Sequence, residues 1–450
     1  MAAFAAATVC GAFGPFFIAS NRALGLALLF VCVVFAGAGF VARDRVGLDF
    51  GAGVPLTVGA IAIAFLIGIV GQDYRIAGVD DQVPLLLGVT VAMLMLGAIF
   101  AVSVLPSTAP RWKGRDFSSI FDSSFLAVFG LGLALLALIN VLTGSIPLLA
   151  PNIDEARFAG GVGVFAPVFV FLIGGVQWLL VSGSLVWLLS RRPPKGTLLF
   201  SMSIGLLALL LIASRAIALV IPLTVLLAYV TLGRISTRKL IVFVLAGLIL
   251  LGLAGQARIA GSDPTGEKRA FLVANGYGDG PAGQIIQSAS TGPFVLSHVL
   301  NQVPSAHEFR NGDFFTSDLR QQIPGDFFGD PQAPDQWVTT EILNLDAAFG
   351  SPPTLVGGLY IDWGVPGILI GCFLVGFMLA AVYNWAKRAG TLGSLILYSY
   401  LVGYIIVSAY SYLSLKPSML TFLGLAFILH RIELNHTTEA RVDSSARPVA

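Results

Sequence analysis

Charged residues are scarce in this sequence. Lys, Arg, Asp and Glu occupy only 11% of the 450 positions, whereas a soluble globular chain carries charge at about a quarter of its positions. Hydrophobic residues make up 56% of the chain, and the mean hydropathy is +0.87. This balance excludes a water-soluble globular domain. The formal net charge of +2 also gives no support to a nucleic-acid partner, because binding a phosphate backbone takes a concentrated positive surface.

Cysteine is nearly absent, and so are internal repeats. Cys10, Cys32 and Cys372 all fall inside apolar runs, which excludes a disulfide or zinc framework and indicates small packing residues. Many secondary transporters have corresponding broken helices in two halves of the chain, and this sequence has no such repeat. The missing repeat argues against a carrier.

Long apolar runs, by contrast, are abundant. Runs of roughly 17 to 25 residues have the length that a helix needs to cross a hydrocarbon core of about 30 Å. The first run lacks the basic region of a cleaved signal peptide, so we expect it to be a membrane helix. The expected fold is an all-α, polytopic transmembrane bundle of about 12 helices. The runs lie near residues 3–20, 23–42, 51–71, 83–105, 120–143, 161–190, 197–213, 216–232, 240–256, 355–384, 391–413 and 417–431.

Basic residues cluster in every second loop, and such loops remain in the cytoplasm. This alternation predicts that both termini are cytoplasmic and that one long hydrophilic segment is extracytoplasmic. The expected division is an N-terminal transmembrane bundle at 1–256, an external loop at 257–353, C-terminal transmembrane helices at 354–431 and a cytoplasmic tail at 432–450. The basic clusters are Arg43 and Arg45; Arg111, Lys113 and Arg115; Arg191, Arg192 and Lys195; Arg234, Arg238 and Lys239; and Lys387 and Arg388.

The external loop is rich in Gly, Pro, Asp, Gln and Phe, and its aromatic content argues against simple disorder. Apolar residues at helical spacing predict a short amphipathic helix over 293–303 that turns Ser297, His298 and Asn301 toward another face. The Gly-rich stretch 275–280 is turn chemistry that suits a moving lid.

Three arginines are expected at the outer ends of different helices: Arg157, Arg215 and Arg258. A guanidinium near the hydrocarbon region costs about 2.5 to 3.5 kcal/mol, so each calls for a reason. Guanidinium binds phosphate oxygens in a bidentate manner, and together the three could hold one diphosphate. The alternatives are a lipid anchor for Arg215, a loop ion pair of Arg157 with Asp154 or Glu155, and a boundary charge at Arg258.

Further candidates lie in the loop and its flanks. Arg310 and Arg320 flank an Asp-Phe-Phe motif and could add cations beside aromatic rings that stack on sugars, or remain solvated charges. His298 and His307 could each act as a general base, since imidazole accepts a proton near neutral pH, or pack in the loop. We find no H-x-H, E-x-x-H or D-x-D spacing in the outer segments, so we expect no metal and no cofactor. The alternative bases are Asp154, Glu155, Asp313, Asp318 and Asp362.

The stretch 355–367 combines small residues with an acid at the edge of an apolar run. Small residues allow helices or a re-entrant turn to pack closely. Asp362 would be a costly acid there, and it could serve simply to cap the helix.

The order of these features resembles the oligosaccharide repeat-unit polymerases, also called O-antigen polymerases, which share their architecture with O-antigen ligases. The resemblance is carried by five features in sequence order. They are the Arg157 loop followed by Gly160 to Gly163, the Ser214-Arg215 hairpin, Arg258 after the ninth helix, the loop residues Leu319 to Pro324, and the small residues Gly357 to Gly367.

This resemblance implies a metal-independent glycosyltransferase on the outer face of the bacterial inner membrane. It would transfer a glycan from an undecaprenyl diphosphate carrier to a sugar hydroxyl of a second lipid-linked repeat unit, making O-antigen, capsular polysaccharide or exopolysaccharide. It also implies that Arg157, Arg215 and Arg258 neutralise diphosphates, and that a chain-length regulator protein is a further partner besides the bilayer. The alternatives are a ligase that transfers the finished glycan, or a flippase or other transporter.

Overall fold

The computed structural model describes residues 53–71, 82–105, 112, 123–144, 146, 166–189, 196–212, 215–235, 281–320, 333–344 and 351–445. Within these residues the chain is helical and has no strand. The helices are α3 (Gly53–Gly71), α4 (Gln82–Val104), α5 (Ser123–Thr143), α7 (Ala166–Leu189), α8 (Gly196–Leu211), α9 (Arg215–Thr231), α12 (Pro281–Gln302), α13 (Asp313–Arg320), α14 (Pro334–Trp337), the π-helix η4 (Val338–Ile342), α15 (Thr354–Ala389), α16 (Leu392–Tyr410) and α17 (Pro417–Ser445).

The predicted all-α membrane fold is confirmed. Nine of the predicted spans coincide with described helices, while the spans expected at 3–20, 23–42 and 240–256 lie outside the described residues. Six of the described helices, α4, α5, α7, α15, α16 and α17, are long and apolar enough to cross a membrane. By the composition of its helices, the chain is a multi-pass membrane protein.

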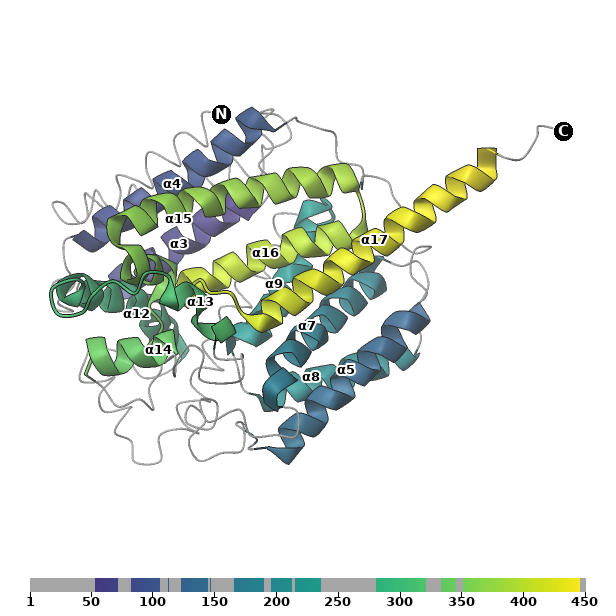
Figure 1. The fold of residues 1–450 in the computed structure, drawn as a ribbon, viewed down its shortest axis with the longest axis horizontal. Coiled ribbons are helices and arrows are strands. Elements are labelled where there is room, and N and C mark those ends of the chain that lie inside the picture. Colours follow the sequence, from purple (N-terminus) through teal and green to yellow (C-terminus); the bar gives the residue numbers. More distant parts are fainter. Residues whose placement is uncertain are drawn as a thin grey trace.

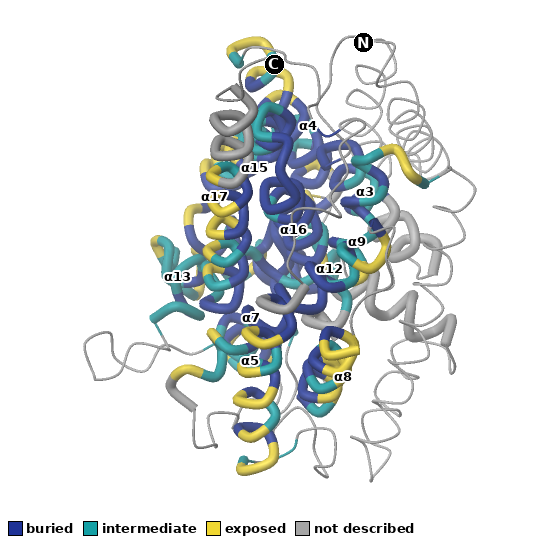
Figure 2. Tube along the Cα trace, turned by 90° about the vertical axis from the view of Figure 1, so that its right-hand side faces the viewer, coloured by how far each residue is buried: buried dark blue, intermediate teal, exposed yellow. Residues whose placement is uncertain are grey.

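Helices α4 and α15 meet through close contacts at small residues. A Cβ atom on Gly97 of α4 would lie 2.0 Å from the Phe373 carbonyl oxygen of α15, and one on Gly376 would lie 2.0 Å from the Leu94 carbonyl oxygen. Glycine at both positions therefore brings the two backbones into contact, as is common between membrane helices. Among the six described helices that are long enough to cross a membrane, α16 is the most enclosed, and 83% of its apolar window is buried (Figures 1 and 2).

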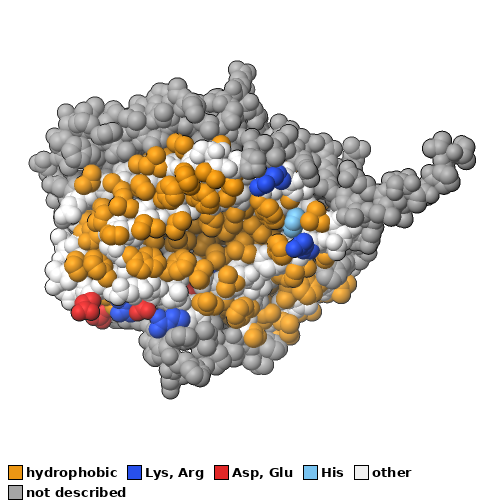
Figure 3. All heavy atoms as spheres, turned by 45° about the horizontal axis from the view of Figure 1, so that its top comes forward, with side chains coloured by type: hydrophobic (Ala, Val, Ile, Leu, Met, Phe, Trp, Pro, Cys, Tyr) orange, Lys and Arg blue, Asp and Glu red, His pale blue; other side chains and the backbone are white. Residues whose placement is uncertain are grey.

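The outer surface of the bundle is apolar. Large side chains such as Phe100, Val128 and Ile370 are 50%, 73% and 61% exposed. In water, so large an apolar surface would promote aggregation. Figure 3 shows one such face, with Lys, Arg, Asp and Glu side chains only near its margins. An apolar band between charged margins matches the cross-section of a bilayer.

The helices of the predicted external loop gather at one end of the bundle, where α15 begins (Figure 1). The amphipathic helix predicted at 293–303 is confirmed but starts earlier, because α12 runs from Pro281 to Gln302. Ser297, expected on a polar face, is instead fully buried, since α12 packs against α3 and α15 on one side and against the loop on the other. The predicted lid at 275–280 lies outside the described residues.

At the other end of the bundle, α17 continues as a helix to Ser445 (Figure 1), well into the segment predicted as a tail from residue 432. The division at residues 256, 353 and 431 and the cytoplasmic placement of both termini remain predictions.

Candidate functional site

The site is organised by a break in helix α15. Gly364 has φ 65° and ψ −153°, a backbone conformation that side chains rarely adopt, and Pro366 follows two residues later. A proline has no N–H to donate to the carbonyl four residues earlier, so the Asp362 carbonyl loses its helical partner. The backbone N–H of Asn311 donates to that carbonyl, and that of Arg310 donates to the Ile361 carbonyl, each at 2.9 Å. The carbonyls at the break therefore hold the turn that contains Arg310 by backbone hydrogen bonds to helix α15.

The Asp362 side chain holds the next element of the loop. Its Oδ1 accepts the Phe314 N–H at 3.0 Å and its Oδ2 accepts the Phe315 N–H at 2.9 Å. Both N–H groups belong to the first turn of α13, whose amides have no partner within the helix. Asp362 is only 1% exposed. The sequence reading that Asp362 caps its own helix is wrong: it caps α13, and since both carboxylate oxygens are engaged, it is poorly placed to act as the alternative base.

The turn before α13 is tight. Asn311 and Gly312 both have positive φ, 52° and 94°. A Cβ atom on Gly312 would lie 3.1 Å from Cζ2 of Trp363, so glycine is required by both conformation and space. The turn therefore places Arg310 on one side of α15 with little freedom.

The Asp318 side chain, in the second half of α13, accepts hydrogen bonds from the loop between α16 and α17. The Tyr412 hydroxyl donates to its Oδ1 at 3.1 Å, and the Ser414 hydroxyl donates to its Oδ2. Burial, and then the negative charge of Asp318, raise the pKa of Tyr412 well above its usual value, so the phenol remains a donor at neutral pH. Asp318, another alternative base, therefore has a structural role in this arrangement.

Two of the predicted arginines meet at one carboxylate. An Nη of Arg310 lies 3.7 Å from Oδ2 of Asp313, and Arg320 bonds Oδ1 of the same side chain. Two guanidinium groups therefore share one negative charge. Guanidinium groups are also the side chains that bind phosphate oxygens in a bidentate manner.

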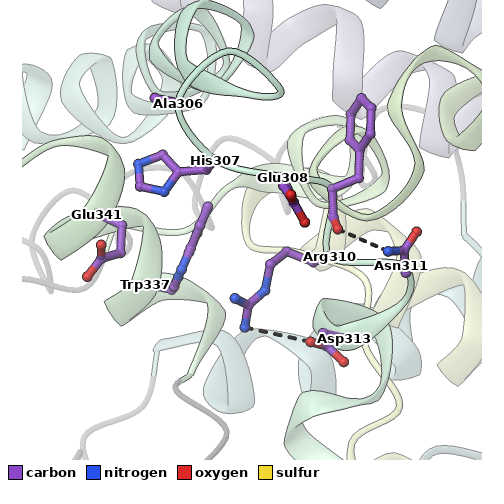
Figure 4. A pocket seen from close by; sticks show the side chains of 9 residues that line it. Ala306, His307, Glu308, Arg310, Asn311, Asp313, Trp337 and Glu341 are labelled. Atoms are coloured by element: carbon purple, nitrogen blue, oxygen red, sulfur yellow. Dashed lines mark hydrogen bonds and ion pairs between the residues drawn. The ribbon is translucent and has the colours of Figure 1, made fainter.

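Arg310 is further held by aromatic rings. Its Cζ atom lies 5.4 Å from the Trp337 ring centre and 6.0 Å from that of Phe314, distances at which a cation is attracted to a ring. The His307 ring lies edge-on to Trp337, 5.4 Å away. Figure 4 shows Trp337 between His307 and the guanidinium.

These residues surround an open cavity of about 510 Å³, lined by residues 306–311, Asp313, Trp337 and Glu341. Cavities of about 300 to 1,000 Å³ are typical of small-molecule sites. Glu341 comes from η4, and such short π-helical segments are frequent at functional sites.

Of the two phenylalanines in the Asp-Phe-Phe motif, Phe314 is not available to stack on a sugar, whereas Phe315 is only partly buried. Phe314 is 2% exposed and packs edge-on against Trp337, which is itself 5% exposed. Both rings belong to a core cluster with Val295, Val299 and Ile361. Phe309, which is partly buried, also lines the cavity, so the described lining is not purely polar.

His298 does not line the cavity. Its Nδ1 lies 3.1 Å from the Phe294 carbonyl, one turn earlier in α12, and its ring contacts the Phe294 ring at 4.3 Å. Among the two predicted histidines, His307 is the one that the structure brings beside Arg310.

The remaining predicted site residues fall outside this description. Asp154, Glu155, Arg157 and Arg258 lie outside the described residues, and Arg215 begins α9 but its side chain lies outside them too. The convergence of Arg157, Arg215 and Arg258 therefore remains a prediction. Within the described ranges, no three His, Cys, Asp or Glu side chains gather as a metal site would.

Sequence reasoning missed Glu308, Trp337 and Glu341 as site residues. Glu308 directly follows a predicted candidate, His307, which was a usable signal. Trp337 and Glu341 come from a different segment, and only the packing of η4 against α12 brings them to the cavity.

The fold and this cavity define a multi-pass membrane protein with a charged, polar site at one end of its bundle. Residues 294–410 match the family described as "Putative O-antigen polymerase". No curated protein and no solved structure matches the chain. The resemblance inferred from the sequence is confirmed over these residues, which run from α12 to the end of α16 and contain the whole described cavity. The family implies a polymerase, which is a glycosyltransferase by reaction class.

Proposed function

We propose that this protein polymerises oligosaccharide repeat units carried on undecaprenyl diphosphate, at the outer face of the bacterial inner membrane. The product would be O-antigen, capsular polysaccharide or exopolysaccharide. The observation that carries this proposal is the Arg310–Asp313–Arg320 cluster beside a polar cavity, within the residues that match the polymerase family.

The arginines would stabilise the leaving group. As the bond from the anomeric carbon to the diphosphate breaks, negative charge accumulates on the departing oxygen, and fixed cations lower the energy of that state. Arg310 is suited to this because Trp337, Phe314 and Asp313 hold its guanidinium before substrate arrives. Arg157, Arg215 and Arg258 are proposed to hold the diphosphates from other helices.

His307 is proposed as the general base. It would accept the proton of the acceptor hydroxyl while that oxygen forms a bond to the anomeric carbon, and the prenyl diphosphate would leave with the electron pair of the broken bond. His307 is preferred over His298 because only His307 lines the cavity. This reaction needs no nucleotide and no metal.

The proposal is tested by analysing both polymer and carrier in cells that lack the native gene and express variants. We expect Arg320→Ala to abolish long-chain glycan and to leave single repeat units on the carrier, while the protein remains inserted. Arg157→Ala and Arg215→Ala should behave in the same way. Normal chain-length ladders from the Arg320 variant would refute the site. Long chains that accumulate on the carrier would instead indicate a ligase.

A further inference from the structure

Gln302, the last residue of α12, connects two segments of the cavity wall through its side chain. Its Nε2 donates a hydrogen bond to the Ile342 carbonyl at 2.8 Å, and Ile342 is the last residue of η4. Carbonyls at the end of a helix have no partner within that helix, so the Gln302 carboxamide supplies a donor from a segment 40 positions away in the sequence. Gln302 is partly buried and is not among the described residues that line the cavity.

The main chain of the same residue holds the turn that carries His307. The Gln302 carbonyl accepts the His307 N–H at 3.0 Å and the Ala306 N–H at 2.7 Å. This turn is also held to α15, because the Tyr360 hydroxyl donates to the Val303 carbonyl at 3.3 Å. Gln302 is therefore bonded to the His307 turn through its backbone and to η4 through its side chain.

The two segments meet again at a ring contact inside the cavity. Trp337 directly precedes η4, and its ring lies edge-on to the His307 ring with the centres 5.4 Å apart (Figure 4). The Leu343 N–H donates to the Val338 carbonyl at 3.0 Å, which closes the π-helical turn between Trp337 and the carbonyl that Gln302 binds. A donor that fixes the end of η4 relative to the His307 turn therefore also fixes the indole relative to the imidazole.

We propose that Gln302 is a positioning residue for His307. Its carboxamide donor keeps η4 and Trp337 against the His307 turn, and the indole in turn holds the imidazole ring at the cavity wall. This inference rests on the proposed function and adds to it the residue that orients its general base. The orientation matters because a base must lie within hydrogen-bond reach of the hydroxyl, and a displacement of about 1 Å can lower a rate by as much as 10²-fold.

The first arm of the test observes the ring contact by NMR, in full-length protein in nanodiscs at pH 7 with isotope-labelled histidine and tryptophan. The His307 and Trp337 signals are assigned by their loss in His307→Ala and Trp337→Phe. Gln302→Met and Gln302→Glu keep the length of the side chain but have no N–H donor, and each should lose the through-space signal between the two rings. Asn301→Ala, which removes an exposed carboxamide from the same turn of α12, is the matched control and should retain it.

The second arm measures glycosyl transfer in the same nanodiscs. The substrate is the undecaprenyl diphosphate-linked repeat unit extracted from cells that lack the native gene. Gln302→Met should lower kcat by about tenfold and leave KM near the wild-type value, because it displaces the base and leaves the arginines in place. In the His307→Ala background the same substitution should cause no further loss, since the two residues act as a unit. Equal losses in both backgrounds would show a merely structural role and refute the inference.

Failure of this inference can be told from failure of the proposed function. If the ring signal is retained in either folded donor-less variant, Gln302 does not position His307, whatever the Arg320→Ala ladder shows. If the ring signal is lost but Gln302→Met polymerises at the wild-type rate, the orientation of His307 does not matter to the reaction, and the inference falls together with the role of His307 as the base. The Arg320→Ala ladder tests the proposed polymerase site independently of both outcomes.

Discussion

Two buried carboxylates, one near each end of helix α15, cap another helix, but their surroundings differ. At its beginning, Asp362 caps α13 from a distance, through the amides of Phe314 and Phe315. Beyond its other end, Glu433 of α17 caps α16 through the amides of Leu392, at 2.7 Å, and Gly393, at 3.3 Å. In each case a buried carboxylate from one helix satisfies the first turn of another.

The difference lies in what surrounds each cap. Around Glu433 the polar groups are buried and bonded to one another: Thr391 Oγ1 lies 2.7 Å from His430 Nδ1, and both are at most 5% exposed. Around Asp362 the neighbouring charges open onto a cavity. A closed polar network stabilises the fold, whereas an open one is available to a ligand, and this difference is why we propose the functional site at the Asp362 end.

The largest expected effect is a difference in polymerisation rate between substitutions of two arginines that have similar aromatic neighbours. Arg310 lies 5.4 Å from the Trp337 ring and Arg431 lies 5.3 Å from the Phe427 ring, at opposite ends of the bundle. Arg310→Ala should lower polymerisation by about 10²- to 10³-fold, as removing one preorganised charge-stabilising donor does. Arg431→Ala should leave the rate near wild type. Polymer yield per inserted protein measures both, and equal losses would remove the distinction between the ends.

The second prediction concerns the two caps. Asp362→Ala and Glu433→Ala should each lower stability by about 2 to 3 kcal/mol, because each leaves two amides without their charged acceptor. Both should lower the thermal unfolding midpoint in nanodiscs. Of the protein that remains folded, only the Asp362 variant should polymerise more slowly, because the Asp362 side chain holds α13, which carries Asp313 and Arg320. A folded Asp362 variant that polymerises at the wild-type rate would show that the site does not depend on the capping of α13.

A smaller effect is expected at the break in α15. Gly364→Ala would place a Cβ atom 3.0 Å from Cζ of Phe309 and would force a positive φ on alanine, a cost of roughly 1 to 2 kcal/mol. Gly424→Ala in α17, where a Cβ atom would meet nothing within 4 Å, is the matched control and should not destabilise. Comparing unfolding midpoints of the two variants checks this, and an unchanged Gly364 variant would show that the break is not strained.

The smallest effect is expected from Tyr412→Phe, which removes one hydrogen bond to Asp318, worth about 1 kcal/mol. The pH dependence has a definite sign. Because burial raises the pKa of Tyr412 in the folded protein, its contribution is constant below the unfolded value of about 10 and is lost as the pH rises above it. Stability measured from pH 7 to 11 should fall more steeply above pH 10 in the wild type than in the variant. Parallel curves would contradict the burial of the phenol.

Particular residues show how far sequence reasoning reached. Apolar run length alone predicted α4, α5, α7, α15 and α16 to within several residues and the start of α17, because the thickness of a bilayer sets that length; α17 continues to Ser445, well past the predicted end. The types and positions of polar residues also singled out Arg310, Arg320, His307 and Asp362 as candidates. Sequence reasoning assigned Asp362 the wrong partner and Ser297 the wrong environment, because periodicity describes one helix face and says nothing of which neighbours cover the others.

The sequence by itself determined that this is an all-helical membrane protein and predicted a polar segment at 257–353, because charge is costly in lipid and the composition and lengths of the apolar runs therefore reveal which segments cross it. Only the tertiary structure decided which charges meet. Glu341 of η4 reaches the cavity that Arg310 and Asp313 line, because contacts between distant segments depend on the break at Gly364 and on the capping of α13. The capping bonds from Phe314 and Phe315 to Asp362 join residues 48 and 47 positions apart, a separation at which no local pattern specifies a partner.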